Sequence, residues 1–164
     1  MHQRIFALVL ALNLSNPPAS AQHRTMWNLI PNRAAPILWT SSQDLVASPF
    51  ASNGKERPTL TIFCGVASAP VVEFKGHFQL LATDAASIQE SWVVIDGETL
   101  PVHWELDRDR ESMTATRSDI QGLAFRMRHG KEMMLGFQTA GGPQQSVTFS
   151  LAGLDALMTK ASCR

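Results

Sequence analysis

The chain has 164 residues, of which 45% are hydrophobic and 17% are charged, and its 14 basic side chains balance 14 acidic ones. A zero formal charge gives no sign of nucleic-acid binding, which needs a basic surface, and the apolar content is too high for a disordered chain. The composition therefore predicts a soluble globular domain with no nucleic-acid partner.

The first 21 residues have the three-part pattern of a secretory signal peptide. Arg4 gives a basic start, residues 5–14 are almost wholly apolar, and three small residues form a cleavage site (Ala19, Ser20, Ala21). A short membrane anchor or a buried helix is the alternative, but the apolar run is too short to span a bilayer. We predict a signal peptide over residues 1–21, a single β-rich domain over residues 22–164, location in the periplasm, and no membrane span after cleavage.

The first half of the domain reads as strands separated by loops. Residues 22–36 form an extended lead-in, residues 37–47 contain one or two strands, and residues 48–58 form a loop rich in turn residues. Residues 59–64 and 71–81 alternate between apolar and polar side chains, which predicts two half-buried strands. Gly76 within the second of these strands suggests a bulge.

The strongest local signal is a hairpin around Asp96 and Gly97. The Asp-Gly pair tolerates the positive φ angles of a tight turn, and apolar strands flank it on both sides. Four residues of the second strand share a buried face (Leu100, Val102, Trp104, Leu106). Pro101 cannot donate to a ladder, which predicts an unpaired or bulged point there.

The period changes to that of a helix at Ser118. Ile120, Leu123, Ala124 and Met127 fall on one helix face, with Ser118 or Asp119 as N-cap and Gly130 as the stop. Strands follow over 131–139 and 145–150, and a short helix over 151–161. We predict a mainly β (α+β) fold, a small antiparallel β-sandwich or open barrel with two short helices.

Cys64 and Cys163 are the two cysteines of the chain. An even count in an exported chain favours a disulfide, which would tie the C-terminal helix to the sheet across about 99 residues. A nucleophilic or redox cysteine is the alternative, although the two residues lack Cys-x-x-Cys spacing.

One group of side chains has the composition of a metal or acid–base site. His103 and Glu105 lie on one face of a strand and Asp107 continues that face, with His77 or His129 as the remaining candidate ligands. The alternative is a solvated sheet face with mixed charges. We predict no metal ligands, no catalytic residues and no cofactor.

Two charged segments are candidates for partner binding. Residues 107–111 alternate acidic and basic side chains, which indicates either a charged docking loop or an exposed connection with local ion pairs. A modest basic cluster lies on and after the first helix and could meet an acidic partner (Arg117, Arg126, Arg128, His129, Lys131).

The tryptophans admit two roles. All four could line a carbohydrate or peptide groove, with Trp92 and Trp104 stacking across the hairpin, or they could serve the core (Trp27, Trp39, Trp92, Trp104). The chain has no Gly-x-Ser-x-Gly, P-loop or GxGxxG motif, so we predict that it is not an enzyme.

Several short motifs together resemble a known family. They are Leu60-x-Ile62-x-Cys64, Asp96-Gly97 leading to Trp104-x-Leu106-x-x-Asp109, and Phe149-x-Leu151-x-Gly153-Leu154 shortly before Cys163. This pattern is similar to small periplasmic proteins associated with type VI secretion, the VasI/TagO group, and less closely to the invasion-associated locus B family. The resemblance implies a periplasmic accessory protein with no catalytic residues and with Cys64 and Cys163 as the family's disulfide.

The predicted function is therefore a non-enzymatic exported accessory or binding protein, whose partner is another periplasmic or envelope protein. Association with a type VI secretion apparatus is the specific form of this prediction. The alternatives are a periplasmic inhibitor, whose residues 107–111 enter the cleft of a partner enzyme, and a small metal-dependent hydrolase that uses His103 and Glu105.

Overall fold

The computed structural model describes residues 27–31, 35–47, 54–65, 70–81, 88–140 and 142–163. The predicted signal peptide lies outside these residues. In chain order, the elements are β1 (Asn28–Ile30), β2 (Ile37–Ser41), β3 (Val46–Ala47), β4 (Lys55–Glu56), β5 (Thr59–Phe63), β6 (Val71–Lys75), β7 (Ile88–Ile95), β8 (Glu98–Leu106), β9 (Ser112–Ala115), α1 (Ile120–His129), β10 (Glu132–Gln138), β11 (Gln144–Ser150) and α2 (Leu154–Lys160).

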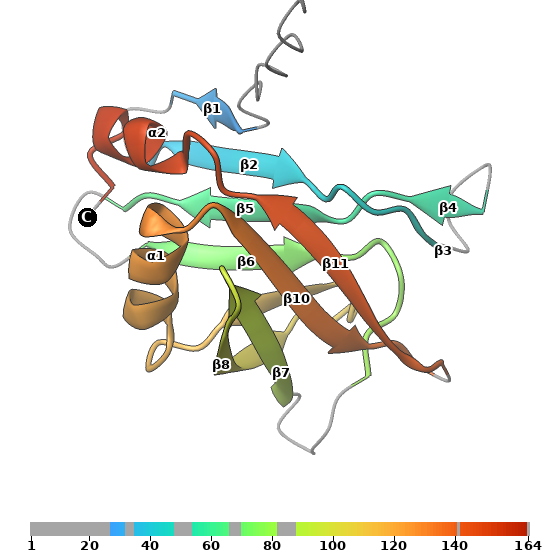
Figure 1. Cartoon of the computed structure of the whole chain (residues 1–164). Helices are drawn as coiled ribbons and strands as arrows, with labels where there is room; N and C mark the ends of the chain where they lie inside the picture. The colour runs from blue at the N-terminus through green and yellow to red at the C-terminus, as the bar shows by residue number, and fades with distance from the viewer. Residues whose placement is uncertain are drawn as a thin grey trace, which may run out of the picture.

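Nine of the described strands form one antiparallel sheet in the order β1-β2-β5-β6-β9-β8-β7-β10-β11, and β3 pairs with β4 separately. The sheet is open but curls until its two ends meet (Figure 1). The backbone N–H of Gln43 donates to the carbonyl of Thr148 at 2.8 Å, and the Trp27 indole donates to the carbonyl of Ser150 at 2.8 Å. The predicted mainly β architecture with two short helices is confirmed.

Both helices lie together at one end of the curved sheet (Figure 1). The four apolar residues that predicted α1 are all buried (Ile120, Leu123, Ala124, Met127). α2 buries Leu154 and Met158. No helix within the described ranges combines the length and the apolar character that crossing a bilayer requires.

The core fills the inside of the curl. Alternate residues of β5, β6, β8, β10 and β11 point inward, so that one face of each strand is buried and the other is partly solvated. The largest fully buried side chains include Trp104, Phe74, Phe137 and Phe149. The ring of Phe74 contacts Phe137 and Phe149 at centroid distances of 5.2 and 6.3 Å.

The Asp96-Gly97 hairpin is confirmed. Asp96 and Gly97 have φ angles of 50° and 88°, which a two-residue primed turn requires, and β7 pairs with β8 from Ile95–Glu98 to Ile88–Glu105.

The bulge predicted at Pro101 is wrong, because the register runs through Trp92 and Pro101 without interruption. Counting from the turn, this is a non-hydrogen-bonded pair, so that the ladder to β7 needs no N–H from proline. β9 joins the other side of β8 only from Trp104 onward.

The strand predicted over 71–81 is too long. β6 ends at Lys75, and His77 has a φ of 58°, which turns the chain away from the strand direction. Inward and outward positions still alternate through Leu80, which is why the pattern looked continuous. Three further strands were not predicted: β1 in the lead-in, β4 in the predicted loop over 48–58, and β9 between residues 107–111 and the predicted helix.

Cys64 and Cys163 form the predicted disulfide, with their Cα atoms 4.9 Å apart. Cys64 follows β5 directly, and Cys163 follows α2, so the bond ties the C-terminal helix to the end of β5, the third strand of the sheet. Both residues are buried, and the chain has no free cysteine.

Candidate functional site

The β8–β9 connection is the candidate site, and we call residues 107–111 the charged loop. β8 and β9 pair antiparallel up to Leu106 and Met113. The backbone N–H of Asp107 then donates to the carbonyl of Ser112 at 3.0 Å. The charged loop therefore begins directly at the end of a paired ladder, and the sheet fixes both of its ends.

Hydrogen bonds inside the charged loop fix its shape. The Asp107 carboxylate accepts from the Ser112 hydroxyl at 2.6 Å, and the Asp109 carboxylate accepts from the backbone N–H of Glu111 at 3.0 Å. Arg110 adopts a φ of 57°, and its N–H donates to the Asp107 carbonyl at 2.9 Å. The carboxylates of Asp107 and Asp109 thus stabilise the turn and are less available to a partner than the other side chains of the loop.

A neighbouring segment, residues 76–80, braces the charged loop. The backbone N–H of Gly76 donates to the carbonyl of Glu111, and that of Leu80 donates to the carbonyl of Arg110, both at 2.8 Å. The Gly76 bond extends the β6–β9 register by one position, and the Leu80 bond lies beyond the turn at His77.

The brace is itself anchored in the core. Phe78 is buried at its centre and stacks on Phe137 with a centroid distance of 5.1 Å. Leu80 is fully buried and pairs with Thr139 at the end of β10. The charged loop is therefore connected through two backbone hydrogen bonds to a segment whose Phe78 and Leu80 are buried in the core.

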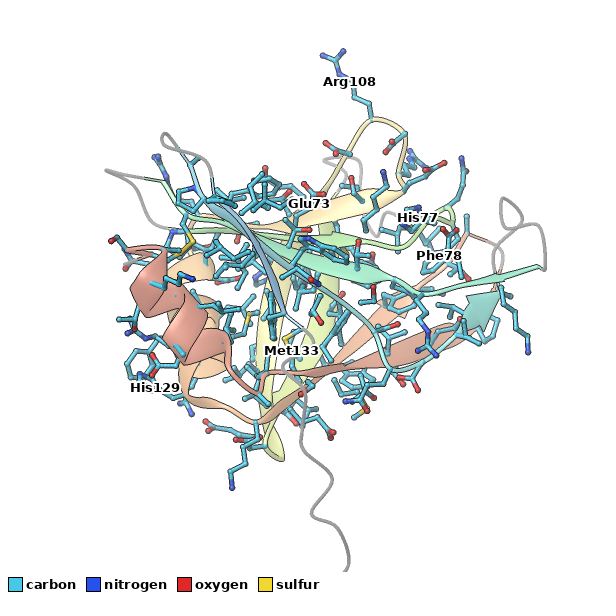
Figure 2. All side chains as sticks on the ribbon, turned by 90° about the horizontal axis from the view of Figure 1, so that it is seen from above. Glu73, His77, Phe78, Arg108, His129 and Met133 are labelled. Atoms are coloured by element: carbon cyan, nitrogen blue, oxygen red, sulfur yellow. A yellow bond between two sulfur atoms is a disulfide. The ribbon has the colours of Figure 1, made fainter. Side chains whose placement is uncertain are left out.

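Arg108 lies at the tip of the charged loop and projects clear of the sheet (Figure 2). Within the part of the chain that the structure describes, neither Arg108 nor Arg110 forms an ion pair. The loop therefore holds an available guanidinium group at a defined position.

The base of the charged loop is acidic. Glu73 on β6 lies beside it, opposite Thr114 of β9. Burial, together with the negative charges of Asp107 and Asp109, raises the pKa of Glu73, and Lys75 offsets only part of this effect. The site thus combines a negative base with a basic tip.

Two arginines of the predicted basic cluster are in ion pairs. Arg126 pairs with Glu98 at the start of β8, and Arg128 binds Asp155 of α2 and the hydroxyl of Thr159. These two arginines join α1 to its neighbours, so they are less available to an acidic partner than Arg108.

His103 and Asp119 form a close pair between β8 and the start of α1. The Asp119 carboxylate lies 2.9 Å from the His103 ring Nδ1 and accepts from the His103 backbone N–H at 2.8 Å. Burial by itself would raise the pKa of Asp119, but the hydrogen bonds from His103 and Ser118 outweigh it, and the pKa is lowered. Asp119 occupies the N-cap position as predicted, yet its side chain makes no capping hydrogen bond to the helix and bonds His103 instead.

The other candidates for a metal or acid–base site are dispersed. Asp107 serves the charged loop, His77 lies 3.8 Å from Glu56, and His129 packs edge-on against Phe125. Figure 2 shows His77 and His129 on different sides of the molecule. Among the described residues, no three His, Cys, Asp or Glu side chains are arranged to hold a metal ion.

Of the two roles considered for the tryptophans, stacking of Trp92 on Trp104 does not occur, and Trp104 and Trp27 serve the core. The register pairs Trp104 with Gln89 and Trp92 with Pro101, and this places the two indoles on opposite faces of the hairpin. Trp104 is fully buried, whereas Trp92 is half-buried and lies over Gly136 of β10. A side chain at position 136 would overlap the Trp92 ring.

The sequence could not show which residues support the site. The brace over 76–80, the half-buried Glu73 and the buried polar residues Gln89 and Ser91 depend on which strands become neighbours. Only the alternation of Glu73 with apolar residues hinted at a partly exposed position.

Comparison of the chain with models of known protein families, with curated proteins and with solved structures found no match. The resemblance to type VI secretion-associated proteins therefore stays a prediction.

Proposed function

We propose that the protein is an exported, non-enzymatic accessory protein that binds another periplasmic or envelope protein through the charged loop. The observation that carries this proposal is the brace: backbone hydrogen bonds from residues 76–80 hold the loop, and Arg108, which has no ion-pair partner among the described residues, projects from its tip. The disulfide supports the proposed export, because such bonds persist mainly in oxidising compartments.

Preorganisation is the physical reason for choosing this loop. A flexible loop loses conformational freedom on binding, whereas a loop already fixed in shape avoids much of that loss. Arginine is enriched among the residues that dominate protein–protein binding energy, since its guanidinium can bond a carboxylate through two N–H groups. A partner surface with a carboxylate at the centre of a shallow pocket fits Arg108.

The family resemblance gives the partner its proposed setting. Components of a type VI secretion apparatus are the envelope proteins it indicates, and we include association with that apparatus in the proposal. The braced loop is compatible with this role because it offers a binding surface and requires no reaction.

Inhibition of a partner enzyme is the second candidate, and the projection of the charged loop favours it over a hydrolase. A loop that inserts into a catalytic cleft must be narrow, exposed and rigid, and residues 107–111 meet these conditions. The two candidates differ in the partner: an assembly component in the first, an enzyme whose activity falls in the second.

Photo-crosslinking in the producing cell tests the proposal. A photoreactive amino acid is placed at position 108 and, as a matched control, at position 117, where Arg117 is also exposed and, within the described part of the chain, outside any ion pair. We expect a discrete envelope-protein adduct from position 108 alone, and its loss when Arg110→Glu is added. Equal adducts from both positions, or none from position 108, would contradict the proposal.

A further inference from the structure

Three polar atoms inside the core have no hydrogen-bond partner in the described part of the protein: the Gln89 Oε1, the Ser91 Oγ and the Trp104 Nε1. Their residues are 1%, 4% and 0% exposed. Buried polar atoms nearly always have a partner, so three orphans in one region need an explanation.

The three residues are neighbours on the inner face of the β7–β8 hairpin. Gln89 lies directly opposite Trp104 in the ladder, and Ser91 lies two residues along the same strand. Residues two apart on a strand share a face, and directly opposed or diagonal side chains are within reach of one another. One bound group can therefore contact all three.

The available atoms define the chemistry of that group. The Trp104 indole only donates, so the group must accept a hydrogen bond. The Gln89 amide nitrogen is 3.5 Å from the Gln138 carbonyl and donates to it, which leaves the amide oxygen as an acceptor that needs a donor. The Ser91 hydroxyl can do either.

We propose that this inner face binds a single uncharged hydroxyl group. A hydroxyl accepts from the Trp104 N–H and donates to the Gln89 oxygen, with Ser91 as the third contact. A carboxylate cannot donate to Gln89, an ammonium cannot accept from Trp104, and a buried charge would have no counter-ion among these three residues. The hydroxyl belongs either to a water molecule or to a small alcohol.

The site is separate from the charged loop, although the two share β8. Trp104 comes three residues before Asp107, where the charged loop begins. The inference therefore stands whether or not the charged loop binds a partner.

Substitution of Ser91 tests the inference through the sign of its effect. If a hydroxyl group is bonded to Ser91, Ser91→Ala removes a bond and the folding equilibrium constant in urea titrations falls about fivefold. If the Ser91 hydroxyl is an orphan, its removal relieves an unpaired buried group and stability rises. Ser146→Ala, at an exposed position of β11, controls for the change in strand propensity. Unchanged or increased stability relative to this control would overturn the inference.

Nuclear magnetic resonance and native mass spectrometry identify the source of the hydroxyl. The indole proton of Trp104, assigned with a Trp104→Phe variant or by selective labelling, should transfer magnetisation to a nearby hydroxyl proton. Transfer to the water resonance, with no added mass on the purified protein, identifies water. Added mass that survives buffer exchange identifies an alcohol. An indole proton with no such contact would refute binding from either source.

Discussion

Removal of the Cys64–Cys163 disulfide is the perturbation with the largest expected effect on stability. The clean variant is the double substitution Cys64→Ala and Cys163→Ala, because it leaves no lone buried thiol. Both cysteines are 2% exposed, and alanine is smaller and apolar, so it introduces neither a clash nor a buried polar atom.

The size of the effect follows from the sequence separation. The disulfide joins residues 99 positions apart, and the loss of loop-closure entropy in the unfolded chain then corresponds to about 4–5 kcal/mol. This is a large fraction of the 5–15 kcal/mol that stabilises a typical domain.

The loss should be felt first at the C-terminus. α2 has seven residues, too few for a helix that is stable by itself, and it buries only Leu154 and Met158. After α2, the backbone N–H of Cys163 donates to the Met158 carbonyl at 2.9 Å, and the disulfide keeps that turn in place.

Urea denaturation and amide hydrogen exchange measure the two effects separately. We expect the double variant to lose about 4 kcal/mol of unfolding free energy, and its α2 amides to exchange faster than those of the β7–β8 hairpin. A loss below about 1 kcal/mol would contradict the chain-entropy reasoning, and equal exchange in α2 and the hairpin would contradict the local role. The unmodified protein should titrate with no free thiol.

Three smaller substitutions test individual contacts. Asp119→Asn should lower the free energy of unfolding at pH 7 by about 1 kcal/mol in urea titrations. Because the pKa of Asp119 is lowered in the folded state, this loss should have its full size above pH 3.8, the ordinary pKa of the group, and should disappear as the pH falls through the folded-state pKa. Glu73→Gln should instead raise the melting temperature at pH 7, because burial raises the pKa of Glu73 and its negative charge therefore opposes folding. The gain should vanish below pH 4.5, where Glu73 is protonated in both the folded and the unfolded state. A lower melting temperature at pH 7 would refute this reasoning. Gly136→Ala should destabilise the protein by about 1–3 kcal/mol and shift the fluorescence of Trp92, because the new methyl group overlaps that ring; an unshifted spectrum would show that the ring stays in place.

Local elements followed from the sequence because their signals are local. The Asp96-Gly97 turn sets its own φ angles, and the apolar spacing from Ile120 to Met127 describes one helix face by itself. The disulfide was predictable because the chain holds only one cysteine pair.

Errors arose where a distant segment determined the local structure. Residues 76–81 alternate like a strand, yet β6 ends at Lys75, and His77, with a φ of 58°, turns the chain away from the β6–β9 ladder. Stacking of Trp92 on Trp104 was one of two roles considered, and the register excludes it. Trp104 is paired with Gln89, and Gln89 and Trp92 lie on opposite faces of β7 because an odd number of positions separates them. Sheet order, which places β6 beside β9, has no local signal.

The candidate site was predictable only in part. The charge alternation over residues 107–111 indicated a loop of interest, but an exposed connection explained the same pattern. Its rigidity depends on residues 76–80, about 30 positions earlier, and on their anchoring through Phe78. The ion pairs that occupy Arg126 and Arg128 likewise come from β8 and α2.

The way the sheet closes has a consequence for the order of folding. The contacts that join its two ends link residues far apart in the chain: Trp27 with Ser150, and Asp44 with Thr148. Such pairings form slowly, because a long loop must close before they are made, whereas the β7–β8 hairpin needs only its two-residue turn. The curled sheet therefore cannot be completed until β11 has left the ribosome, and the early strands stay partly unpaired until then.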